Sequence, residues 1–393
     1  MTANEISTVA GALTLAVWAY LLLGRGKFWR LQKYMATEDA MAARPSQLPA
    51  VGIVVPARNE AAMIGRSLES LLAQSYGGAI HVFVVDDGST DGTAEVAIKA
   101  AMQAARQTGT RRTGTVIAGK PLPPGWTGKL WAVQQGVERA GEIHPEFLLL
   151  TDADVVHGPE TLAVLVSLAE AGGYDLVSFM VKLECQSLAE RLLIPAFVFF
   201  FFKLYPPAWI SDPGKSTAGA AGGCMLIRRE ALAKAGGIAA IRAEIIDDCA
   251  LARAVKQSGG KLWLGLAPES QSIRSYRSFS EIARMISRTA FNQLGHSTAL
   301  LVLATLAMTV TYLLPVGLLF ADHAVSAICG GITWAAMMIC YLPAVRAYKL
   351  NPLWGLTLPV AAIFYMVATL DSALSFWRGR GGEWKGRIQD PGR

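Results

Sequence analysis

Residues 147–154 read FLLLTDAD and residues 81–87 read HVFVVDD, so two apolar runs each end in carboxylates. A third run, VGIVVPA at residues 51–57, is followed by Arg58, Asn59 and Glu60. Short, strongly apolar runs of this kind predict buried β-strands. Further elements are expected between them, namely a strand near 115–118 and helices near 60–74, 91–106 and 129–140.

This alternation of strands and helices predicts βαβ units and a mostly parallel sheet. Ligands bind such sheets at the carboxyl ends of the strands, where the acidic groups lie in this chain. We therefore expect one site rather than three separate acidic turns. The first strand is followed by no G-x-G-x-x-G motif and the chain has no Walker P-loop, which argues against a dinucleotide oxidoreductase or a P-loop NTPase.

The composition indicates a membrane protein. Of the 393 residues, 52% are hydrophobic and only 17% are charged, against about 25% charged in ordinary soluble domains. Five cysteines without C-x-x-C spacing exclude a disulfide scaffold and favour a reducing compartment. The net charge is +6, and its basic side chains cluster at the borders of apolar segments, as at anionic lipid headgroups, so no nucleic-acid partner is expected.

Residues 6–24 carry no charge, and this segment is long enough to form one transmembrane helix. The basic residues Arg25, Lys27, Arg30 and Lys33 follow this segment, so the positive-inside rule places everything after it in the cytoplasm of a bacterial-type inner membrane. We expect residues 1–45 to be an anchor with a basic linker and residues 46–290 to be the cytoplasmic domain. A buried core helix is the alternative reading of 6–24.

Residues 291–393 are expected to form two to three further spans and a basic tail. The candidate spans are 298–320, 324–343 and 354–376. Three crossings would leave the basic tail (Arg378, Arg380, Lys385 and Arg387) outside, against the positive-inside rule, so one segment is re-entrant or the rule fails here.

The acidic strand ends suggest chemistry on a diphosphate. Asp152 and Asp154 form a D-x-D pair that can share Mg²⁺ or Mn²⁺ with phosphate oxygens, since Mg²⁺ is bound by one or two carboxylates plus substrate phosphates. In the stretch VVDDGSTDGT (84–93), Gly88 and Thr90 have a simple explanation as a turn and a helix cap. The adjacent Asp86 and Asp87 are not explained by that turn.

These motifs resemble the signature set of family 2 glycosyltransferases, which have the GT-A fold. The resemblance covers about residues 50–290 and is closest to the membrane-bound, hopene-associated glycosyltransferase subgroup. It rests on VPARNE (55–60), DDGSTDGT (86–93), DAD (152–154), PLPPGWTGKLWA (121–132), RLLIPAFVFFF (191–201), AGGCMLIRRE (221–230) and IDDCALARAVK (246–256). The expected architecture is thus a GT-A domain with transmembrane helices at both ends.

The resemblance implies a nucleotide-sugar donor, a divalent metal and a membrane lipid acceptor. Asp152 and Asp154 would hold the metal on the diphosphate, with Asp154 the more direct ligand, and Lys129 would place a cation near the phosphates. The residues that would border the nucleotide are Pro56, Ala57, Arg58, Glu60, Asp86 and Asp87. The acceptor side would be lined by Gly222, Gly223 and Cys224, with no nucleophilic role expected for the thiol.

Asp248 matches the family's catalytic base, with Asp247 the next candidate. A neighbouring carboxylate and partial burial would raise the pKa of one of the two towards a useful value, although Asp247 can also be read as a helix cap. Processive polysaccharide synthases carry Q-x-x-R-W after the base, of which only Arg288 remains here, so a single transfer is favoured over polymer synthesis. Arg288 or Arg284 would contact the diphosphate, and His296 reads better as an interface residue than as a metal ligand.

The segment from 192 to 202, LLIPAFVFFFF, is apolar for eleven residues, which as a helix is about half a bilayer core. We expect a helix near 191–205 that lies in the membrane interface, with Arg191 and Lys203 at headgroup level, and guides the acceptor. A buried core helix is the alternative.

The sequence thus predicts a membrane-bound inverting transferase that moves a sugar, expected to be UDP-linked, to a lipid such as a hopanoid. The alternatives are a polyprenyl-phosphate sugar transferase and a non-catalytic membrane module that keeps the fold.

Overall fold

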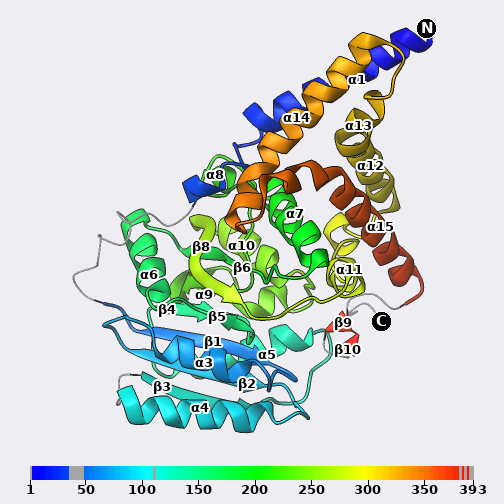
Figure 1. Cartoon of the computed structure of the whole chain (residues 1–393). Helices are drawn as coiled ribbons and strands as arrows, with labels where there is room; N and C mark the ends of the chain where they lie inside the picture. The colour runs from blue at the N-terminus through cyan, green and yellow to red at the C-terminus, as the bar shows by residue number, and fades with distance from the viewer. Residues whose placement is uncertain (1, 35–47, 109–111, 380–382, 385–386, 389–393) are drawn as a thin grey trace. The chain divides into compact units, whose positions relative to one another are not determined.

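The computed structural model describes residues 2–34, 48–108, 112–379, 383–384 and 387–388 (Figure 1). The chain divides into two compact units. The sheet unit comprises Tyr34–Glu184, Trp209–Arg274 and Gly382–Arg393, and the helical unit comprises Met1–Lys33, Cys185–Ala208 and Ser275–Gly381. The expected linker boundary at 45, and Arg380 and Lys385 of the basic tail, lie outside the described residues.

An eight-stranded sheet forms the core of the sheet unit, in the order β3-β2-β1-β4-β7-β6-β8-β5. Its strands are β1 (Val51–Ala57), β2 (Ile80–Asp86), β3 (Arg112–Ala118), β4 (Phe147–Leu150), β5 (Val155–Val156), β6 (Leu176–Lys182), β7 (Met225–Arg228) and β8 (Leu262–Ser272). Two short strands, β9 (Glu383–Trp384) and β10 (Arg387–Ile388), pair separately.

The sheet is mixed, and its two halves differ. Strands β3, β2, β1 and β4 are all parallel, as the alternation of strands and helices in the sequence predicts, because parallel strands need a crossover connection such as a helix. Strand β7 runs antiparallel to both β4 and β6, and β5 runs antiparallel to β8. The parallel register, with Val51 opposite both Ile80 and Phe147, brings the carboxyl ends of β1, β2 and β4 to one edge.

Helices cover the sheet with one apolar face each. In α3 (Ile64–Leu72) the buried residues Ile64, Leu68 and Leu71 recur at helical spacing, and each such side chain stabilises the fold by about 1.5–3 kcal/mol. The remaining helices of this unit are α4 (Thr93–Thr108), α5 (Gly128–Gly141), α6 (Thr161–Gly172), α9 (Arg229–Lys234), η4 (Ile238–Ile241) and α10 (Asp247–Gln257).

The helical unit consists of helices, several of them long and apolar. They are α1 (Ala3–Ala19) with η1 (Tyr20–Gly24), η2 (Leu31–Tyr34), α7 (Leu188–Leu204), α11 (Phe279–Ser287), η5 (Asn292–Leu294), α12 (Thr298–Met308), η6 (Thr309–Leu313), α13 (Leu314–Leu318), α14 (Ala324–Ala347), η7 (Pro352–Thr357) and α15 (Leu358–Trp377). Five stretches of the described chain are long and apolar enough to cross a membrane: Ala3–Gly24, Leu188–Ile210, Thr298–Leu318, Ala324–Ala347 and Pro352–Trp377.

These helices leave apolar stripes on their surface. On α14, Val325, Ile328 and Ile332 follow one another three and four residues apart and are each about half exposed. On α15 the same spacing is shown by Val360, Ile363, Val367, Leu370 and Leu374. Large contiguous apolar surface is rare on soluble monomers and is typical of contact with lipid or a partner.

The segment after residue 187 differs from its sequence-based description. A capping box formed by Ser187 and Glu190 starts α7 at Leu188, so the helix has 17 residues, and α8 (Pro207–Ile210) extends the candidate span to 23. The estimate of an eleven-residue segment too short to span is therefore wrong. Within this segment, which was expected to lie in the membrane interface, Phe199 and Phe202 are buried, with Phe199 against Phe28 and Tyr341 of the same unit.

Candidate active site

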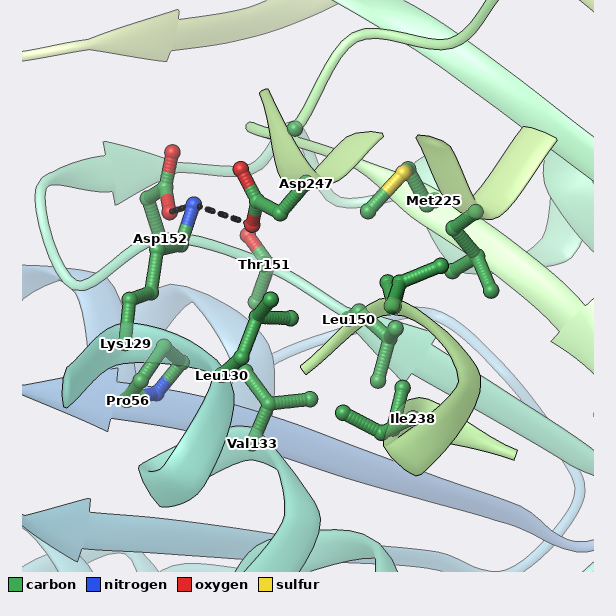
Figure 2. Close-up of a pocket in the computed structure, with 13 residues that line it drawn as sticks. Pro56, Lys129, Leu130, Val133, Leu150, Thr151, Asp152, Met225, Ile238 and Asp247 are labelled. Carbon is green, nitrogen blue, oxygen red and sulfur yellow. Dashed lines mark ion pairs between the residues drawn. The ribbon is translucent and has the colours of Figure 1, made fainter. Parts of the chain in front are cut away.

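Lys129 is the centre of a charged cluster at the carboxyl end of the parallel strands. Its Nζ lies 3.0 Å from Asp152 Oδ1 and 3.0 Å from Asp247 Oδ2, as the dashed lines in Figure 2 mark. Lys129 comes from the first turn of α5, Asp152 follows β4, and Asp247 begins α10. The two carboxylates raise the pKa of the ammonium despite its burial, so Lys129 is a permanent cation here.

Asp248, the expected base, is held next to this cluster by the backbone. Its Oδ2 accepts a hydrogen bond from the Gly222 amide at 2.9 Å and its Oδ1 accepts one from the Cys249 amide at 2.7 Å. A Cβ atom at Gly222 would lie 3.4 Å from Asp248 Oδ2 and 3.7 Å from Lys129 Nζ. These are ordinary van der Waals distances, so position 222 lies in direct contact with both the Asp248 carboxylate and the Lys129 ammonium.

The environment of Asp248 suits a general base. Burial, and then the negative charge of Asp247, raise its pKa from 3.8 to about 6, although Lys129 and the two amide hydrogen bonds act in the opposite direction. Burial is also the largest effect at Asp152, whose pKa is raised. A carboxylate that titrates close to neutral pH can accept a proton from a substrate more readily than an ordinary Asp.

Asp154 has a cationic partner that the sequence did not suggest. Arg274, two residues beyond β8, donates from Nε to Asp154 Oδ2 at 2.6 Å and from Nη2 to both oxygens of Glu60, at 2.6 and 2.9 Å. Strand β8 carries it there, because Ser272 pairs with Val155 immediately after the D-x-D turn. No motif in the sequence marks this arginine.

The remaining nucleotide-side residues stand at the ends of β1 and β2. Arg58 lies 3.6 Å from the buried Asp87 carboxylate and donates to the Asp87 carbonyl. Asp86 Oδ1 accepts hydrogen bonds from Ser89, so this carboxylate closes the turn after β2. Pro56 and Ala57 are buried in β1, and the Ala57 carbonyl accepts from the Asp87 amide at 2.8 Å.

A buried imidazole fixes the D-x-D turn from below. The Thr151 hydroxyl donates to the Gly223 carbonyl at 2.7 Å and lies 2.9 Å from His157 Nε2, while His157 Nδ1 lies 3.2 Å from Ser270 Oγ. The donation to Gly223 leaves Thr151 to accept from Nε2–H, with Nδ1 accepting from Ser270. Burial lowers the pKa of His157 to about 4. This neutral histidine was not singled out in the sequence.

Gly222, Gly223 and Cys224, which are expected to line the acceptor side, lie immediately before β7. A Cβ at Gly223 would meet Val181 at 2.9 Å, so this glycine allows close backbone packing. Cys224 is fully buried, and burial raises its pKa to about 12, which agrees with the absence of a nucleophilic role. Figure 2 shows apolar side chains beside the ion pairs, and they form the wall of a pocket: Leu130, Val133, Leu150, Met225, Ile238 and Leu251.

Arg288 is not among the residues that the sheet unit gathers. It caps α11 in the helical unit, which also contains Arg284 and His296. The imidazole of His296 stacks on Phe376 at 4.0 Å between centroids, as expected of a packing residue. The role of Arg288 at the diphosphate remains a prediction.

The donor set at Asp152 and Asp154 fits a hard divalent cation. Within the described residues the structure gathers no group of three or more His, Cys, Asp or Glu side chains able to hold a metal ion. Mg²⁺ is usually bound by one or two carboxylates together with substrate phosphates, and these two aspartates can supply such a pair.

The sheet order and the acidic strand ends define a GT-A fold of the nucleotide-sugar type. Residues 52–236 match glycosyl transferase family 2, and this part of the chain belongs to that family. The match ends before Asp247 and Asp248.

Two curated proteins show the range of relatives. An uncharacterized protein of Methanocaldococcus jannaschii, MJ1222, is 32% identical over 124 residues, which is 32% of this chain and 43% of that protein. Undecaprenyl-phosphate 4-deoxy-4-formamido-L-arabinose transferase of Pseudomonas paraeruginosa is 32% identical over 136 residues, or 34% of this chain and 36% of that protein. The chain thus matches less than half the length of each of these relatives.

Among solved structures, the fold is similar to the mannosyltransferase PcManGT from Pyrobaculum calidifontis in complex with GDP-Man and Mn²⁺. The TM-score is 0.53 at 18% identity, covering 93% of this chain and 99% of that one. At this identity the likeness concerns the fold alone.

Proposed function

We propose that this chain is a membrane-bound inverting glycosyltransferase that moves a sugar from a nucleoside diphosphate, expected to be UDP, to a lipid. The observation that carries the proposal is Asp248, whose two oxygens are fixed by amides and whose pKa is raised to about 6 beside Lys129. Family 2 membership of residues 52–236 supports the reaction class.

In this reaction the acceptor oxygen attacks the anomeric carbon from the face opposite the diphosphate. The bond between that carbon and the diphosphate oxygen breaks, and the nucleoside diphosphate leaves with the electron pair. The acceptor proton passes to Asp248. Lys129 lies 3.0 Å from both Asp152 and Asp247, so its cation can stabilise the negative charge that develops on the leaving diphosphate.

A divalent cation would be held by Asp152 and Asp154, as Mn²⁺ accompanies GDP-Man in the similar PcManGT. Such an ion neutralises charge on the diphosphate. On the nucleoside side we assign Arg58, Glu60, Asp86 and Asp87, with Pro56 and Ala57 of β1 beside them. Gly222, Gly223 and Cys224 would border the acceptor.

The nature of the acceptor can be argued from the base. A lipid hydroxyl must lose a proton during attack and needs a carboxylate such as Asp248, whereas a lipid phosphate is already ionised at neutral pH and needs none. The environment of Asp248 therefore favours a hydroxyl, as on a hopanoid. The curated relative named for undecaprenyl phosphate supports the second candidate, a polyprenyl-phosphate acceptor.

The membrane assignment rests on the helical unit. Its candidate spans expose apolar stripes, and Arg25, Lys27, Arg30 and Lys33 follow the first of them. The positive-inside rule then places the sheet unit in the cytoplasm, at a bacterial-type inner membrane.

The test is to incubate membranes containing the full chain with labelled UDP- and GDP-sugars and to add either a hydroxylated polycyclic lipid or a polyprenyl phosphate. The product is identified by mass, with membranes carrying Asp248→Asn as the matched control. We expect a metal-dependent, labelled lipid from the wild type. If no donor and acceptor yield a product although the nucleotide binds, the chain is the non-catalytic module and the proposal fails.

A further inference from the structure

Arg274 joins two parts of the site that are far apart in the sequence. Its guanidinium bonds Asp154 on one side and both oxygens of Glu60 on the other, at 2.6–2.9 Å. The side chains of Glu60, Asp154 and Arg274 are 8%, 14% and 28% exposed, so this contact is largely shielded from water.

The position of Arg274 has a direct electrostatic consequence for a metal ion. Asp154 Oδ2 already receives the guanidinium and, at 3.4 Å, the Ser272 hydroxyl. A divalent cation that binds Asp154 must displace this guanidinium or lie next to it, and either costs free energy in a shielded site. The hydrogen bonds from Nη2 to both oxygens of Glu60 keep Arg274 nearby, because hydrogen bonds between two ionised groups are stronger than those between neutral groups.

A diphosphate changes this balance, since its negative charges attract both cations. Once the diphosphate is bound, the phosphate and carboxylate oxygens together provide enough ligands for both the metal ion and Arg274. Metal and nucleotide would then increase each other's affinity by the same factor, as thermodynamic linkage requires.

We propose that Arg274 is a positioning residue that couples metal binding to donor binding, by competing with the divalent cation for Asp154 until a nucleoside diphosphate arrives. This inference rests on the proposed function. It predicts that the site binds the metal ion weakly in the absence of nucleotide, and that Arg274 is the cause.

The experiment measures Mn²⁺ binding to the full chain in lipid nanodiscs by electron paramagnetic resonance of the free ion, with and without UDP or GDP. We expect Arg274→Met to bind Mn²⁺ alone about tenfold more tightly than wild type, within the usual 5–150-fold range of such couplings. The factor by which the nucleotide strengthens Mn²⁺ binding should fall correspondingly. Arg274→Gln keeps hydrogen-bonding groups without the charge and should show the same trend if the Met variant does not fold.

Arg228 provides a matched control in the same unit. It also bridges two carboxylates, Glu146 at 3.1 Å and Glu170 at 2.6 Å, and it is 25% exposed. Arg228→Met should leave Mn²⁺ binding and the nucleotide effect unchanged.

The outcomes separate the two proposals. Unchanged or weaker Mn²⁺ binding by both Arg274 variants overturns the coupling role while leaving the transferase intact. A wild-type chain that binds no Mn²⁺ with either nucleotide overturns the proposed function and this inference together.

Discussion

The two units accommodate a shielded cation in opposite ways. In the sheet unit, Arg274 lies between the carboxylates of Glu60 and Asp154. In the helical unit, Lys203 donates to the Tyr312 hydroxyl at 2.8 Å and lies over the rings of Tyr312 and Phe200, at 4.9 and 5.3 Å from their centroids. Charge is paired with opposite charge where a charged substrate is expected, and with rings and a hydroxyl among apolar helices.

The difference between the two units indicates that the charged cluster of the sheet unit has a functional role. A single cation near the end of an apolar helix can be tolerated through its long stem and through cation–π contacts. Fixing several carboxylates around two cations costs desolvation energy without a clear gain in stability, so such a cluster indicates function.

The largest effect is expected at the base. Asp248→Asn keeps the shape of the side chain but cannot take the acceptor proton, so turnover with a hydroxyl acceptor should fall by about 10²–10⁴-fold. Steady-state kinetics with labelled donor measure this, and nucleotide affinity should be preserved. Near-normal turnover would move the base to Asp247 or indicate a phosphate acceptor.

A matched pair of isoleucines tests whether the helical unit faces lipid. Ile98 on α4 and Ile332 on α14 are 43% and 55% exposed. Ile332→Asp should oppose membrane insertion by about 2.5–3.5 kcal/mol, whereas Ile98→Asp should change stability by no more than about 0.5 kcal/mol. The measurement is the yield of each variant in washed membranes. Equal yields would contradict the prediction that the helical unit, unlike the sheet unit, faces lipid.

The two shielded cations should differ in what their removal costs. Arg274→Met removes the guanidinium bonds to Glu60 and Asp154 and should destabilise the chain by about 1–3 kcal/mol. Lys203→Met removes a charge from among rings and should be neutral within about 1 kcal/mol. Thermal unfolding of both variants in the same detergent measures their stability. A larger loss of stability for Lys203→Met than for Arg274→Met would contradict this prediction.

The smallest expected effect is the pH dependence of transfer. With a pKa of about 6, Asp248 is about 90% ionised at pH 7 and about 10% at pH 5, so kcat/KM should fall roughly tenfold as pH falls across that range. Asp247 and Lys129 face this carboxylate, and a cation bound at Asp152 would lower the apparent pKa of Asp248. A flat profile between pH 5 and 7 would contradict a base role.

The stability of the fold should depend on the ionisation of Asp248 in the opposite sense to the rate of transfer. Its folded pKa is raised above the unfolded value, so the folded state binds more protons between about pH 4 and 6, and stability falls as pH rises through that window. Asp248→Asn should therefore raise the midpoint of thermal unfolding at pH 8 more than at pH 4.

Local sequence was sufficient where a strand and its polar end are adjacent in the chain. The runs at 51–57 and 81–87 match β1 and β2 to within a residue, because short apolar runs that are rich in valine and isoleucine and bounded by polar turn residues favour buried strands. The D-x-D pair was singled out from its position at the end of a strand, and Asp248 from the family resemblance; the roles assigned to these residues stay predictions.

What depended on distant pairing could not be read from the sequence. Arg274 reaches Asp154 only because β5 pairs with β8, residues 155 and 272 lying opposite each other. The direction of β7 could not be predicted either, since the four residues Met225–Arg228 carry no sign of the direction in which the strand runs. The start of α7 was readable, however, from Ser187 and Glu190 three residues apart.

The imidazole beneath the D-x-D turn makes the proposed kinetics easier to interpret. Because the pKa of His157 is lowered to about 4, the hydrogen bonds that it makes to Thr151 and Ser270 persist, in one protonation state, across the interval in which Asp248 titrates. The hydrogen bonds that support the turn therefore do not change with pH over that interval. A pH–rate curve of this protein should then record the ionisation of the reacting groups rather than a change in the shape of the turn that presents them.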